Sequence, residues 1–345
     1  MFTAFAIIFT FGIVVFFHEL GHFIAAKKSG VRVEKFSLGF GPELFGFTKG
    51  DTRYLVSLVP LGGYVKMAGE NPEEGKESAP DEFLVQPWYK KVFIVFSGPV
   101  MNFVLAVLLF ALVAFVWGIP VPKTDEARIG EVSAGSPAER AGLKKGDLIM
   151  SIDEKRVSDW EDMSRIIHYS ANKELELILA RKDQELTVNV TPEFNEQSHV
   201  GLIGIAAPFD MVKMNMFQSA MTGIEQTADW SVLIVKFIGW MVMGKVKAEV
   251  SGPVGVGQLI AKVAKTGFEN LLYFIGIISV HLGIFNLLPV PILDGGHIMF
   301  FTVEGIKGSP IDPKKLNIAQ IVGMTLLIAL MLFATYKDFL RLFIK

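Results

Sequence analysis

The sequence predicts a membrane α-helical protein with four transmembrane helices, a membrane-associated β-meander and one α+β domain outside the membrane. Three observations lead to this fold class. The chain of 345 residues is 51% hydrophobic with a mean hydropathy of +0.44, which is too apolar for a soluble protein of this size. It contains four apolar stretches of spanning length. Between the second and third, residues 123–207 have the composition of a soluble domain.

Charge and cysteine content narrow the possible functions. The 33 basic and 35 acidic residues nearly balance, so we expect no nucleic-acid partner. Cysteine is absent, which excludes disulfides and thiolate metal ligands. Any bound metal ion must therefore be held by nitrogen and oxygen atoms.

Residues 1–27 form the first predicted span. They carry no charge from Phe2 to Phe17, and Lys27 and Lys28 close the segment. The length suits a hydrocarbon core of about 30 Å. A signal peptide is the alternative, but a basic start and a small-residue cleavage site are lacking. The basic residues that follow the span place its end toward the cytoplasm.

Ionisable side chains near the end of this span indicate a metal centre. His18 and His22 are four residues apart, so both imidazoles project from one helical face and can bind a single zinc ion. Glu19 lies beside the first ligand, where it can act as general base on a water that zinc activates. An ionised group in the bilayer costs ~2.5–3.5 kcal/mol, which favours a functional role over a packing role.

Residues 28–91 are predicted to form a β-rich region on the cytoplasmic side. Short strands are expected at 31–36, 54–59 and 64–67, followed by a solvated acidic loop at 70–82. Two interpretations remain open for the strands. They form a small structural sheet, or an edge strand near the zinc pairs with a substrate unwound from its helix.

The second span is predicted over residues 92–119. Its basic start at Lys90 and Lys91 is cytoplasmic. Pro99 should kink or delay the helix, and Asn102 needs a polar partner, which we expect to be a packing contact with a neighbouring helix.

Residues 123–207 are predicted to form an extracytoplasmic domain, since the second span ends outside. Strands are expected at 128–133, 148–152, 174–180 and 185–190, and a helix near 160–169. The run from Gly130 to Ile149 resembles the core of a bacterial PDZ domain, in which Ser136 begins a short helix. In this resemblance the segment from Gly201 to Ile205 is the loop that receives a terminal carboxylate.

Residues 208–268 are predicted to be an amphipathic helix and a connecting region. The helix over 214–244 carries a narrow polar face that includes Lys236, so we expect it to lie on the outer membrane surface. A glycine-rich break follows at 251–257. The third span and an irregular turn fill 269–300, and a loop and the fourth span, at 318–336, fill 301–345. Both chain ends are then outside.

Two histidines leave a catalytic zinc one protein ligand short. The candidates are Asp294, His281 and His297. Asp294 is favoured, because the third span brings it to the cytoplasmic level of His22. His281 lies about two turns deeper and suits a contact between helices, and the role of His297 stays open.

These motifs together resemble the site-2 protease family, in particular bacterial members of the regulator of sigma-E protease type. The resemblance rests on the His18–His22 pattern, on residues 60–67, on the PDZ-like domain and on residues 286–297. It implies that His18, His22 and Asp294 bind one zinc ion and that Glu19 is the general base.

The resemblance also implies a substrate and a location. Asn286 and the strand around Gly62, Gly63 and Tyr64 would hold an extended substrate. Substrates would be single-pass membrane proteins, such as pre-cleaved anti-sigma factors or signal-peptide remnants. The protein would lie in the bacterial inner membrane. Enterobacterial members carry two tandem PDZ domains, whereas this chain has room for one.

Two other functions compete with proteolysis. A membrane-anchored PDZ adaptor with a structural zinc site would not need Glu19. A metal transporter would need a continuous polar path across the bilayer, and the spans offer few polar residues beyond the catalytic cluster.

Overall fold

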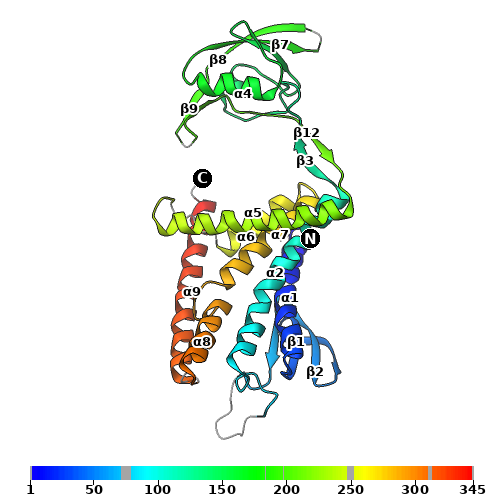
Figure 1. Ribbon diagram of the computed structural model, residues 1–345, viewed down its shortest axis with the longest axis vertical. Coiled ribbons are helices and arrows are strands. Elements are labelled where there is room, and N and C mark those ends of the chain that lie inside the picture. Colours follow the sequence, from blue (N-terminus) through cyan, green and yellow to red (C-terminus); the bar gives the residue numbers. More distant parts are fainter. Residues whose placement is uncertain are drawn as a thin grey trace. The chain divides into compact units, whose positions relative to one another are not determined.

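The computed structural model describes residues 2–70, 79–182, 184–196, 198–246, 252–309 and 313–343, so most of the predicted acidic loop lies outside the described residues. The chain divides into two compact units (Figure 1). Unit 1 comprises Met1–Val116 and Met214–Lys345, and unit 2 comprises Trp117–Lys213. Within the described ranges, the helices long and apolar enough to cross a membrane are Thr3–Lys28, Trp88–Val116, Phe268–Asn286 and Ile318–Arg341. This confirms the prediction of four apolar helices of spanning length.

The helices of unit 1 are α1 (Phe2–Lys28), α2 (Trp88–Val116), α5 (Met216–Val242), α6 (Pro253–Ala264), α7 (Phe268–Asn286), α8 (Asp294–Lys307) and α9 (Pro313–Phe343). Helix α2 packs against α1, α5, α7 and α8 and is therefore the central helix of the unit. Pro99 lies inside α2 without ending it. Gly21 allows α1 and α2 to approach closely, because a Cβ there would lie 2.1 Å from the carbonyl oxygen of Ser97.

Helix α5 is not among the helices of spanning length and composition in the described ranges. Asn215 caps its start through a reciprocal pair of hydrogen bonds with Gln218. Its buried side includes Gly223 and Ile234, and Ile234 joins α2 and α7 residues in one apolar cluster. Figure 1 shows α5 lying crosswise to α2 and α9. Its placement on the outer membrane surface stays a prediction.

The region after α1 forms β1 (Val33–Lys49) and β2 (Thr52–Met67), longer than the three short strands predicted. Both strands bend repeatedly, so that segment 35–38 pairs with 63–66 on one side and with 53–56 on the other, while 53–56 also pairs with 45–48. Gly39 and Gly41 have positive φ and allow the bend in β1. The segment 63–67 is thus an edge of this sheet.

Two segments predicted to be irregular are helical. The predicted glycine-rich break at 251–257 is wrong for its described part, because α6 begins at Pro253. Proline suits the first helical turn, and the buried Asp338 carboxylate accepts hydrogen bonds from the N–H groups of Gly252 (3.1 Å) and Gly255 (2.8 Å). Helix α8 starts at Asp294, so the irregular turn ends before that residue. The helix continues to Lys307, so the loop predicted before the fourth span begins later than expected.

The described residues of unit 2 form a four-stranded sheet, three two-stranded sheets and two short helices. Its elements are β3 (Ile119–Pro122), β4 (Glu131–Val132), α3 (Pro137–Arg140), β5 (Leu148–Ile152), β6 (Lys155–Arg156), α4 (Trp160–Tyr169), β7 (Leu175–Arg181), β8 (Gln184–Val190), β9 (Glu193–Asn195), β10 (Val200–Leu202), β11 (Ile205–Ala206) and β12 (Phe209–Val212). The main sheet has the order β6-β5-β7-β8, and β11 pairs with β4. Ser136 caps α3, as predicted. Strands β3 and β12 pair where the chain enters and leaves the unit.

Candidate metal centre

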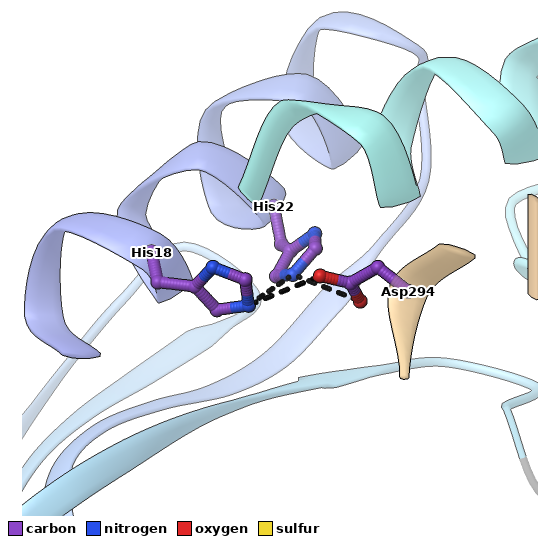
Figure 2. Close-up of side chains that lie close together, drawn as sticks. All are labelled: His18, His22 and Asp294. Atoms are coloured by element: carbon purple, nitrogen blue, oxygen red, sulfur yellow. Dashed lines mark hydrogen bonds and ion pairs between the residues drawn. The ribbon is translucent and has the colours of Figure 1, made fainter. Parts of the chain in front are cut away.

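Two histidines of α1 and one aspartate of α8 converge inside unit 1 (Figure 2). His18 Nε2 lies 3.2 Å from His22 Nε2 and 3.2 Å from Asp294 Oδ2, and His22 Nε2 lies 3.7 Å from Asp294 Oδ1. Both histidines are buried, and Asp294 is half-buried. Its Oδ2 is buried and receives no hydrogen bond from the described residues.

These distances suit a tetrahedral zinc ion. With Zn–N and Zn–O bonds of about 2.0–2.1 Å, tetrahedral geometry places ligand atoms ~3.3 Å apart. The two imidazole nitrogens are 3.2 Å apart, and the carboxylate oxygens lie 3.2 Å (Oδ2 to His18) and 3.7 Å (Oδ1 to His22) from them, close to this value. Two imidazoles and a carboxylate also match the donor set of open, catalytic zinc sites. The residues therefore fit the metal.

The position of each donor follows from the helices that carry it. The four-residue spacing of His18 and His22 puts both rings on the α1 face that packs against α2. The space for them depends on Gly98 of α2, where a Cβ would lie 2.3 Å from His22 Nε2. Asp294 is the first residue of α8, and the tight turn before it needs Gly295, whose Cβ would lie 2.3 Å from the Leu287 carbonyl oxygen.

Helix α2 also contacts the outer nitrogen of each ring. His22 Nδ1 donates to the Ile94 carbonyl oxygen over 2.9 Å, and His18 Nδ1 lies 3.1 Å from Asn102 Nδ2. Each ring therefore presents Nε2 to the centre. The sequence predicted a packing contact with a neighbouring helix for Asn102 and did not predict its contact with His18. Its four-residue spacing from Gly98 was the available signal, because it puts both on one face of α2.

Glu19 joins the site to the sheet. Its Oε2 accepts a hydrogen bond of 3.0 Å from the Val65 N–H on the edge segment. A Cβ on Gly63 would lie 3.6 Å from Glu19 Cγ, so the backbone of the edge segment lies against the Glu19 side chain. Gly62 has φ +145° and faces the ring of Phe40, and a Cβ there would lie 2.3 Å from that ring. The Tyr64 ring stacks on the same Phe40 ring.

Of the remaining residues that the sequence singled out, Asn286 lies beside the three donors, whereas His281 and His297 make other contacts. Asn286 is the last residue of α7, and its Nδ2 lies 3.4 Å from His18 Nε2. His281 instead hydrogen-bonds the Ile277 carbonyl of its own helix, and the His297 ring contacts Phe301. Neither histidine belongs to the donor group found among the described residues.

Comparison with known proteins decides the family. The model of peptidase family M50 matches residues 6–330, nearly the whole chain. The chain belongs to peptidase family M50, the site-2 proteases. It is 32% identical to the zinc metalloprotease RasP of Oceanobacillus iheyensis, with all of both chains covered. It is 30% identical to the regulator of sigma-W protease RasP of Bacillus subtilis, with 99% of each covered.

Two further similarities involve a whole protein and a single solved domain. A putative zinc metalloprotease of Clostridium acetobutylicum is 36% identical over 96% of this chain and 95% of that protein. The solved PDZ domain of an SdrC-like protein from Listeria monocytogenes is similar to 26% of this chain and 90% of that domain, at 19% identity and a TM-score of 0.22. The protein is a zinc metalloprotease of the membrane, and the predicted enzyme class is confirmed.

Proposed function

We propose that this protease hydrolyses peptide bonds in the transmembrane segments of single-pass membrane proteins, using one zinc ion per chain held by His18, His22 and Asp294. The observation that carries the proposal is the convergence of these three donors in a unit with four helices of spanning length. Helix α2 contacts both histidine rings, and the edge segment contacts Glu19 beside them.

Glu19 is the proposed general base. When bound, zinc supplies a Lewis acid that lowers the pKa of a water molecule and polarises the scissile carbonyl. Glu19 accepts the proton of that water as the oxygen adds to the carbonyl carbon. The C–N bond then breaks, and Glu19 returns the proton to the leaving amine nitrogen.

The edge segment provides a binding surface for an unwound substrate. Val65 is paired with Phe36 of β1, yet its N–H points away from β1 to Glu19. In an antiparallel strand the N–H and C=O of one residue point to the same side, and alternate residues share that side. Gly63 and Val65 therefore present their backbone to the site. A substrate strand that pairs there recovers hydrogen bonds lost when its helix unwinds.

Asn286 and Tyr64 complete the proposed substrate contacts. The Asn286 amide, beside His18 Nε2, can donate to the carbonyl oxygen that gains negative charge during hydrolysis. Tyr64 and Phe40 form an aromatic surface next to Gly62.

Unit 2 is the proposed substrate reader. Its strands β5, β7 and β8 and its helix α4 overlap the strands and the helix expected from the sequence, and the segment from Gly201 to Ile205 contacts α3 and α4. We infer that it selects substrates by size or by a new terminus, from the extracytoplasmic side of the bacterial inner membrane. The active site is then toward the cytoplasm. An anti-sigma factor is a fitting substrate class, since one relative is named regulator of sigma-W protease.

The test is Glu19→Gln in the full-length protein, reconstituted with a tagged single-pass membrane substrate. Glutamine retains an oxygen for the Val65 N–H but cannot accept a proton. The variant should retain zinc and the wild-type melting temperature, while cleavage disappears. Cleavage at the wild-type rate with zinc bound would refute the assignment of Glu19 and favour the adaptor function.

A further inference from the structure

Asn102 is fully buried in the middle of α2, with 0% of its surface exposed. Its backbone carbonyl accepts a hydrogen bond of 2.8 Å from the Ser279 hydroxyl of α7. Its side-chain Nδ2 lies 3.1 Å from His18 Nδ1, and its Oδ1 is buried without a partner among the described residues. An unpaired amide oxygen in this environment needs a physical explanation.

The tautomer of His22 is fixed by its surroundings. A carbonyl oxygen only accepts hydrogen bonds, so the 2.9 Å contact with Ile94 requires a proton on His22 Nδ1. The lone pair of a neutral ring is then on Nε2, which faces Asp294. This is the tautomer that binds a cation through Nε2.

The same reasoning applied to His18 determines the orientation of the Asn102 amide. His18 Nε2 faces His22 and Asp294, so a cation bound there requires the proton on Nδ1. An N–H and an amide NH₂ are both donors and cannot bond to each other. Rotation of the amide by 180° exchanges its oxygen and nitrogen, which occupy nearly the same positions. Oδ1 then accepts from His18 Nδ1.

We propose that Asn102 is a positioning residue for the metal centre, whose amide oxygen accepts a hydrogen bond from His18 Nδ1–H. This inference rests on the proposed metal site. Helix α2 then orients both imidazoles, His18 through a side chain and His22 through the Ile94 carbonyl. A hydrogen bond to the outer nitrogen fixes the ring and raises its basicity as a ligand.

The experiment compares Asn102→Leu, Asn102→Asp and Ser279→Ala in the full-length protein in detergent. Leucine has a similar shape and no polar atom, whereas aspartate can accept but cannot donate. Ser279→Ala is the matched control, because it removes the hydrogen bond to the Asn102 backbone and leaves the contact with His18. The readouts are zinc affinity by chelator competition, the electronic spectrum of the Co²⁺-substituted protein, and the melting temperature without metal.

Asn102→Leu should weaken zinc binding by roughly 10- to 100-fold and alter the Co²⁺ spectrum. Asn102→Asp and Ser279→Ala should stay within a few-fold of wild-type affinity. Equal loss in the Asp and Leu variants would overturn the proposal, because it would mean that Asn102 acts as a donor or through packing. If Asn102→Leu does not accumulate, the aspartate variant alone decides: retained affinity supports an acceptor, and a tenfold loss overturns it.

The outcomes also separate this inference from the proposed function. A wild-type chain that binds no zinc overturns the metal centre and the inference together. A wild-type chain and an Asn102→Leu variant that bind zinc equally well overturn the inference alone.

Discussion

Replacement of Gly98 by alanine should disable the metal centre from the helix opposite the ligands. The added Cβ would lie 2.3 Å from His22 Nε2, 2.4 Å from His22 Cε1 and 2.9 Å from His18 Cε1. Non-bonded carbon atoms are at their optimum ~3.5–4.0 Å apart. Because these atoms belong to both rings, each imidazole must move, and His22 must move by about 1 Å.

A displacement of this size should be costly for catalysis. A misplacement of about 1 Å can reduce the rate by ~10²-fold. We expect Gly98→Ala to lose zinc during dialysis against a chelator and to cleave the reconstituted membrane substrate at least ~10²-fold more slowly. Metal content by mass spectrometry and cleavage by gel shift are the assays.

Gly12→Ala is the matched control for this change. Gly12 lies in α1, and its added Cβ would meet the Pro60 carbonyl oxygen at 3.7 Å, an ordinary contact. Alanine inside a helix is favoured over glycine by about 1 kcal/mol, so this variant should keep zinc, activity and stability. Full zinc occupancy and cleavage in Gly98→Ala would refute the packing argument for the site.

Three further predictions concern buried charges. Lys91, 2% exposed, pairs with Glu304 at 2.6 Å, so Lys91→Met should lower stability by about 3 kcal/mol, and adding Glu304→Leu should restore most of it. Additive losses in a thermal double-mutant cycle would contradict this. Burial alone would raise the pKa of Asp147, but hydrogen bonds from Arg181 and a backbone N–H outweigh it and lower that pKa. The Asp147 carboxylate therefore stabilises the fold above its unfolded pKa near 3.8 and loses this effect as pH falls through the folded value. By urea unfolding, Arg181→Met should have a lower free energy of unfolding than wild type, and this difference should shrink below pH 3.8. A difference that does not change with pH would count against the Asp147–Arg181 pair. Asp338→Ala should cost about 1–2 kcal/mol by uncapping α6, seen as faster hydrogen exchange there, and unchanged exchange would argue against the cap.

The sequence was sufficient where one strong signal controls the structure. Uninterrupted apolar stretches predicted the spans, since a charge-free segment of this length has few other stable environments. The spacing of His18 and His22 predicted their common face. The predicted topology favoured Asp294 as the third donor, and in the structure its carboxylate lies beside the imidazoles of His18 and His22. Its role as a ligand stays a prediction, as do the roles of Glu19 and Asn286.

The sequence was insufficient where a distant residue decides the local structure. Residues 252–257 contain three glycines and resemble a break, yet Asp338, more than eighty positions away, caps them as a helix. The contact of Asn102 with His18 depends on how closely α1 and α2 approach. Gly21 and Gly98 permit this approach, but the sequence does not show that they face the other helix. The bends of β1 likewise depend on pairing with two separate parts of β2.

X-ray absorption at the zinc K edge tests the convergence of the three donors most directly. Wild-type protein in detergent should hold one zinc ion per chain, with two imidazole nitrogens at ~2.0–2.1 Å and an oxygen shell. Asp294→Ala should change the oxygen shell and release zinc to a chelator at least tenfold more readily. An unchanged spectrum and unchanged affinity in that variant would show that the third ligand comes from elsewhere.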